Sequence, residues 1–187
     1  MEQREHTLQS TTVFAGRLLT VVCDTVQLPD GSQSSREMVR HRGAVGVAAV
    51  DKAGGIWLVR QFRYAAGREL LEIPAGTREA GETPRATAER ELREELGCTA
   101  RCWTQLAQFY TSPGFSDELL TLYLAEDLEF QTDTESLGVE GEFLRRERWP
   151  LDRALEAALQ GEFQDAKTLV GILLAAARLG VKGGRGA

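Results

Sequence analysis

The chain has 187 residues, 42% of them hydrophobic, which predicts one globular domain with room for a small appendage. Its formal net charge of −6 argues against a general nucleic-acid binder, and no apolar run reaches the roughly 20 residues of a membrane-spanning helix. The polar N-terminus predicts no signal peptide, and the three cysteines lack metal-site spacing, so we expect a reduced, cytoplasmic protein with free thiols.

The first section of the chain predicts antiparallel strands. Residues 18–28 are rich in β-branched side chains, residues 29–32 (Pro-Asp-Gly-Ser) predict a turn, and residues 35–42 return. Because this section precedes the first continuous apolar run, we expect residues 1–42 to form a small antiparallel β subdomain.

The next section predicts three strands. The apolar run at 44–50 should be a buried strand, and a turn should join it to a partner strand at 56–64. A short strand at 70–73 should end at Pro74 and Gly76, since proline cannot donate to a sheet ladder.

A helix should then span residues 84–96. Thr83 is a good N-cap, Pro84 suits the first helical position, and Gly97 suits the left-handed position that ends a helix.

The remainder of the chain predicts further strands and two helices. We expect strands at 103–109, 119–125 and 143–149, a polar surface loop at 126–141, helices at 150–159 and 165–179, and a disordered tail at 181–187. Strands and helices alternate without a regular βαβ repeat, which predicts an α/β (α+β) domain over residues 43–180, with helices packed around a mixed sheet.

The predicted helix carries an unusual group of acids. Glu91, Glu94 and Glu95 fall at i, i+3 and i+4, where like charges repel unless a cation lies among them. Such a group is often only a solvated helix face. Here we expect no arginine to balance it on the same edge, and Glu91 and Glu95 should lie between the buried side and the solvent. A divalent cation is therefore expected, and Mg²⁺ or Mn²⁺ prefers such hard oxygen ligands.

The stretch from residue 76 to 98 resembles the Nudix box. The matching residues are Gly76, Glu82, Arg90, Glu91, Leu92, Glu94, Glu95 and Gly97, with Cys98 as a mildly unusual final apolar position. The resemblance implies a Nudix hydrolase: an α/β/α sandwich that uses Mg²⁺ or Mn²⁺, with two or more ions, to cleave a nucleoside diphosphate linked to another group.

The resemblance also implies roles for single residues. Glu91 and Glu95 would be metal ligands, and Ala75 would give its backbone carbonyl to a metal. Glu94 would assist the metal-bound waters, and Arg90 would orient the carboxylates through salt bridges.

Three further stretches resemble the ADP-ribose pyrophosphatase subgroup: residues 59–63, 71–76 and 112–118, the last of which contains the downstream marker Pro113. The resemblance implies hydrolysis of ADP-ribose to AMP and ribose 5-phosphate by a homodimer that exchanges its N-terminal strands. The alternatives are a Nudix enzyme for another nucleotide sugar or dinucleotide, and a non-catalytic sensor of ADP-ribose. The sensor is disfavoured because every glutamate of the box is retained.

The substrate would be a small nucleotide sugar, with neither nucleic acid nor a membrane as partner. Five candidate contacts lie in the subgroup's stretches: Arg63 for phosphate, Glu72 beside the site, Pro113 as the marker, Phe115 for base or ribose, and Glu118 for a ribose hydroxyl. Arg42, at the end of the N-terminal section, is a further candidate for phosphate. Each has an ordinary structural alternative, such as a surface arginine or local packing.

The resemblance implies that the catalytic base comes from an acidic loop that closes over the substrate. Glu142 is our first candidate, Glu140 is the alternative, and the box residue Glu94 is the third.

Overall fold

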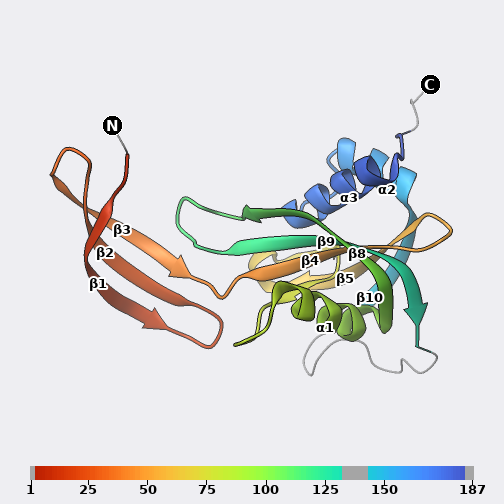
Figure 1. The fold of residues 1–187 in the computed structure, drawn as a ribbon, viewed down its shortest axis with the longest axis horizontal. Helices are drawn as coiled ribbons and strands as arrows, with labels where there is room; N and C mark the ends of the chain where they lie inside the picture. Colours follow the sequence, from red (N-terminus) through yellow and green to blue (C-terminus); the bar gives the residue numbers. More distant parts are fainter. Residues whose placement is uncertain (1–2, 132–142, 184–187) are drawn as a thin grey trace. The chain divides into compact units, whose positions relative to one another are not determined.

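The structure is a computed structural model that describes residues 3–131 and 143–183. Its elements in chain order are β1 (His6–Ala15), β2 (Thr20–Gln27), β3 (Gln33–Arg40), β4 (Ala44–Val50), β5 (Gly55–Arg63), the 3₁₀ turn η1 (Tyr64–Ala66), β6 (Arg68–Glu72), β7 (Ala75–Thr77), α1 (Pro84–Leu96), β8 (Cys98–Tyr110), β9 (Leu119–Phe130), β10 (Arg145–Pro150), α2 (Leu151–Leu159) and α3 (Ala166–Leu179) (Figure 1). None of the helices in these described ranges is long and apolar enough to cross a membrane.

The chain divides into two compact units. The N-terminal unit holds the described residues up to Gly43 together with Phe109–Leu119, and the larger unit holds Ala44–Gln108 and the described residues from Leu120 onward. The segment between β8 and β9 thus packs with strands far from it in the sequence.

The N-terminal unit is a three-stranded antiparallel sheet in the order β1-β2-β3. The segment after β8 joins it: the Val39 N–H donates to the Phe115 carbonyl at 2.7 Å, and the Asp117 N–H donates to the Val39 carbonyl at 3.1 Å. β2 alternates buried and half-buried residues, whereas β1 is exposed along its whole length. The apolar side chains of β1, which include Val13 and Phe14, are therefore uncovered in the single chain.

The larger unit is built on a mixed sheet in the order β10-β5-β4-β9-β8, with β6 paired to β5 and β7 paired to β4. The central strand β4 is wholly buried, and it is parallel to β9 and antiparallel to β5 and β7. In Figure 1, α1 lies on one side of this sheet, and α2 and α3 lie on the other. The predicted fold class, an α/β/α sandwich on a mixed sheet with a separate antiparallel sheet, is confirmed.

Helix α1 begins and ends where the sequence predicts. The Thr83 hydroxyl accepts from the Ala86 N–H at 3.1 Å, and Gly97 adopts φ 63° while its N–H donates to Arg93. One face of the helix buries Leu92 and Leu96 against Val45 and Val47 of β4. Burial of each leucine stabilises the fold by about 1.5–3 kcal/mol. The same packing also holds α1 against β7, the strand paired with β4.

Two strands are longer than predicted. β8 starts at Cys98 rather than residue 103, and β9 continues to Phe130 rather than ending at residue 125. Residues 126–130 are polar enough to suggest a loop, but tertiary contacts extend the strand: the rings of Trp57 and Phe130 pack in a tilted pair with their centroids 4.6 Å apart, and Arg101 pairs with Glu129. The rest of the predicted loop, residues 132–141, lies outside the described residues.

The strand β7 was missed, because three residues that contain glycine and follow a proline carry no strand signal. It exists because its backbone pairs with β4, Val45 opposite Gly76. The other boundaries shift by one or two residues: β10 spans Arg145–Pro150, α2 begins after Pro150, and α3 begins after its cap Asp165.

Candidate active site

The site is built where α1 lies against the backbone of β7. Glu91 and Glu95 point from α1 toward this strand and are 8% and 5% exposed. The expectation that they lie at a solvent border is wrong, because the unforeseen strand β7 covers them. The Ala75 N–H donates to Glu95 Oε2 at 3.0 Å, which fixes that carboxylate against the main chain.

Gly76 makes room for the other carboxylate. A Cβ at this position would overlap the Glu91 side chain, well inside the 3.0 Å that real Cβ contacts essentially never cross. The glycine of the box is therefore required here by close approach of a carboxylate to the backbone, and not by a left-handed conformation.

Arg90 links the acids into one network. Its Nη1 donates to Glu91 Oε1 at 2.6 Å and to Glu94 Oε2 at 3.0 Å, while its Nε donates to Glu82 Oε1 at 3.0 Å. Its Nη2 reaches the Thr77 carbonyl at 3.2 Å. The expectation that no arginine balances the acids on their own edge is therefore wrong: the guanidinium folds back over them and offsets their repulsion.

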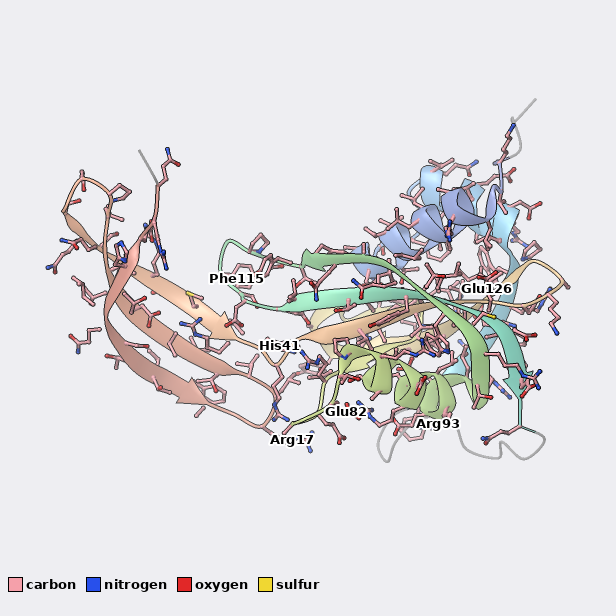
Figure 2. All side chains as sticks on the ribbon, in the orientation of Figure 1. Arg17, His41, Glu82, Arg93, Phe115 and Glu126 are labelled. Atoms are coloured by element: carbon pink, nitrogen blue, oxygen red, sulfur yellow. The ribbon has the colours of Figure 1, made fainter. Side chains whose placement is uncertain are left out.

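This network changes the pKa values of its members. The hydrogen bonds to Glu82 are the largest cause that raises the pKa of Arg90. In turn, the Arg90 hydrogen bond, followed by one from the Glu79 N–H, lowers the pKa of Glu82 to about 2. Glu82 lies in the loop before α1 (Figure 2) and stays ionised at any ordinary pH, so it anchors Arg90 from outside the helix.

The donor set fits a hard divalent cation. Glu91 and Glu95 supply carboxylate oxygens, and the Ala75 main chain lies directly beside Glu95. No group of three His, Cys, Asp or Glu side chains forms a ready metal site among residues 3–131 and 143–183. Mg²⁺ needs no such group, because it usually keeps several waters and takes further ligands from substrate phosphates.

A second ionic cluster lies beside the first. Arg63, at the end of β5, forms a two-pronged pair with Glu72 of β6, Nε to Oε1 at 2.8 Å and Nη2 to Oε2 at 2.7 Å. Lys167 of α3 donates to Glu72 Oε2 as well. The negative charge of Glu95 contributes to raising the pKa of Arg63, which places this cluster within electrostatic reach of the acids on α1.

Sequence reasoning missed Lys167, although a signal was present. The residue follows the α3 cap Asp165 by two positions, in the first turn of an apolar helix. A cation is unfavourable at the positive end of a helix dipole, so a lysine there needs a nearby acid. Lys167 has two, Glu72 and, at 2.9 Å, Asp165.

Four other predicted residues belong to the N-terminal unit. Arg42 donates to the Arg17 carbonyl at 3.2 Å, and Glu118 accepts from the Thr111 hydroxyl at 2.5 Å. Pro113 and Phe115 help to line a pocket of about 400 Å³ within this unit, and Phe115, labelled in Figure 2, is 58% exposed. Arg42 and Glu118 are not among the residues that line it. The candidate bases Glu140 and Glu142 lie outside the described residues.

Comparison with known proteins agrees with this geometry. The profile of the NUDIX domain matches residues 40–170, and that of the nucleoside diphosphate sugar hydrolase N-terminal domain matches residues 5–39. The chain is 43% identical to an ADP-ribose pyrophosphatase of Bacillus subtilis, with 90% of each chain covered. It is 40% identical to a methanol dehydrogenase activator of Bacillus methanolicus, with the same coverage of each.

Two further relatives extend the comparison. An ADP-ribose pyrophosphatase of Mycobacterium tuberculosis is 39% identical, over 89% of this chain and 81% of that one. The crystal structure of an ADP compounds hydrolase superposes with a TM-score of 0.81 at 25% identity and covers 95% of each chain. The resemblance drawn from residues 76–98 is confirmed, and the chain belongs to the Nudix hydrolase family.

Proposed function

We propose that this Nudix hydrolase cleaves the pyrophosphate bond of ADP-ribose and releases AMP and ribose 5-phosphate. The observation that carries the reaction class is the buried pair Glu91 and Glu95, seated on the β7 backbone where Gly76 leaves room for a carboxylate. Support for the substrate comes from the similarity to two ADP-ribose pyrophosphatases across most of the chain.

The box residues have the roles that their contacts permit. Glu91, Glu95 and the Ala75 carbonyl would hold Mg²⁺ or Mn²⁺, with two or more ions. Held there, such a cation would supply positive charge against the pyrophosphate and would lower the pKa of a bound water. Arg90 donates to both Glu91 and Glu94 and would keep their carboxylates oriented, and Glu94 would assist the metal-bound waters.

Other residues would select the substrate. Arg63 would bind a diphosphate oxygen, with Glu72 as its partner. Residues of the N-terminal unit would contact the adenosine or ribose: Arg42, Pro113, Phe115 and Glu118. We further propose a cytoplasmic homodimer formed through the N-terminal strands, which the exposed apolar side chains of β1 support.

We propose Glu142 as the general base, with Glu140 as the alternative. Glu142→Gln should lower kcat while ADP-ribose still binds, because the amide keeps the shape of the side chain but cannot accept the proton. The measurement is steady-state kinetics of both Gln variants, with direct binding by calorimetry. Equal loss in Glu140→Gln and none in Glu142→Gln would reverse the assignment.

A substrate panel tests the proposed function. Purified protein with Mg²⁺ or Mn²⁺ should show its highest kcat/KM for ADP-ribose when compared with ADP-glucose, GDP-sugars, NADH and diadenosine polyphosphates. The products should be AMP and ribose 5-phosphate by chromatography. A higher kcat/KM for another nucleotide sugar would keep the reaction class and replace the substrate.

A further inference from the structure

Glu72 is a buried carboxylate with two cationic partners. Glu72 is 1% exposed. Arg63 donates hydrogen bonds to both of its carboxylate oxygens, and Lys167 donates to one of them. Burial is the strongest influence on its pKa and favours the neutral acid, yet the bonds and charges of Arg63 and Lys167 outweigh it, so the pKa lies below its usual value. Glu72 is therefore a fixed negative charge inside the protein.

The two cations are held differently. The Lys167 side chain is 14% exposed, sits at the start of α3 and also pairs with Asp165 at 2.9 Å. Arg63 is the last residue of β5, and its side chain is 40% exposed. Lys167 is thus a fixed partner of Glu72, while Arg63 has open solvent on one side.

The second cation lowers the free-energy cost of releasing Arg63 from the buried Glu72 carboxylate. Removing the only partner of a buried ion pair is strongly unfavourable, because a charge is left uncompensated in the protein interior. With a single cation, Glu72 would hold Arg63 permanently. With Lys167 in place, Arg63 can leave and Glu72 remains paired.

We propose that Lys167 is a positioning residue that frees Arg63 to exchange between Glu72 and the pyrophosphate of the substrate. Glu72 holds the guanidinium ready when the site is empty. A pyrophosphate offers the same two-pronged acceptor geometry as the Glu72 carboxylate and carries more negative charge. It therefore competes with Glu72 for the Arg63 guanidinium. Glu95 of α1 lies close enough to influence Arg63, which places the exchange near the acids of α1. The inference rests on the proposed function, since it requires a pyrophosphate substrate.

The kinetic test removes Lys167. Lys167→Met should raise KM for ADP-ribose about tenfold, equivalent to about 1.4 kcal/mol of binding, with little change in kcat. Lys167→Arg should stay close to the wild type, because it restores the cation. Lys52→Met removes the same charge from an exposed pair with Asp127 and should change neither constant. Thermal unfolding of each variant separates these effects from a loss of fold.

Two double variants give the sharper result. Glu72→Gln in the Lys167→Met background should restore KM, because no buried charge then holds Arg63. In an Arg63→Gln background, Lys167→Met should have no further effect on KM. The same tenfold rise in that background would overturn the inference and leave Lys167 a purely structural residue.

A spectroscopic test does not depend on turnover. The NMR signal of the Arg63 Nε–H group should move when inorganic pyrophosphate is added to the metal-free wild type, and should not move in Lys167→Met. An unmoved signal in the wild type would show that Arg63 stays on Glu72, which refutes the exchange. If this signal moves but ADP-ribose is not hydrolysed, the proposed substrate fails while the exchange stands.

Discussion

Glu91→Gln and Glu95→Gln should each lower kcat for ADP-ribose at least about a hundredfold at fixed Mg²⁺, since each would remove a negative oxygen ligand from the proposed metal site. Glutamine keeps the size of the side chain, so the packing of α1 on the sheet should survive. The two variants should differ in one respect. Glu91→Gln also removes an anionic partner of Arg90, whereas Glu95→Gln leaves that network intact.

The measurement is kcat as a function of Mg²⁺ concentration, with metal binding followed by calorimetry. Glu89→Gln is the matched control, because Glu89 lies on the same helix, is exposed and pairs with Arg85 at 2.8 Å, away from the β7 backbone. It should keep normal turnover. Turnover near that of the wild type in Glu91→Gln or Glu95→Gln would show that the residue concerned is not a metal ligand.

Gly76→Ala should be nearly as damaging, although it adds a single methyl group. The new Cβ would overlap the Glu91 carboxylate, so either that carboxylate or the β7 backbone must shift. A displacement of about 1 Å in a catalytic group costs about a hundredfold in rate. We therefore expect kcat to fall at least about that far while the protein stays folded.

The control for this variant is Gly183→Ala, where the added Cβ would meet its nearest atoms at 3.7 Å, an ordinary contact distance. Circular dichroism and thermal unfolding should show both variants folded, and only Gly76→Ala should lose activity. A fully active Gly76→Ala protein would mean that the Glu91 position does not matter for catalysis.

Helix α1 was predictable because its signals are local. A cap at Thr83, a proline at the first position and a glycine at the end all act within a few residues of the backbone that they fix. The acids at one-turn spacing are local as well, so the sequence alone suggested a cation. The central strand β4 was equally clear, since a wholly apolar run must be buried.

Features that depend on distant partners were not predictable. The strand β7 exists only because β4 offers its backbone, and its presence turns Glu91 and Glu95 from border residues into buried ones. The polar end of β9 is held by Trp57 and Arg101, which lie well before it in the chain. The residues 109–119 pack with the N-terminal strands, which no pattern within that segment indicates.

The sequence by itself determined the reaction class through its resemblance to the Nudix box over residues 76–98, and the spacing of the glutamates on the predicted helix suggested a cation. Only the tertiary structure decided how the charges are balanced. Arg90 folds back over the acids, and Lys167, some 95 residues after Glu72 in the chain, reaches that buried carboxylate from another helix. The physical reason is that capping, turn and helix-spacing rules act over a few residues, whereas the energy of a buried charge depends on every group that folding brings within a few ångströms of it.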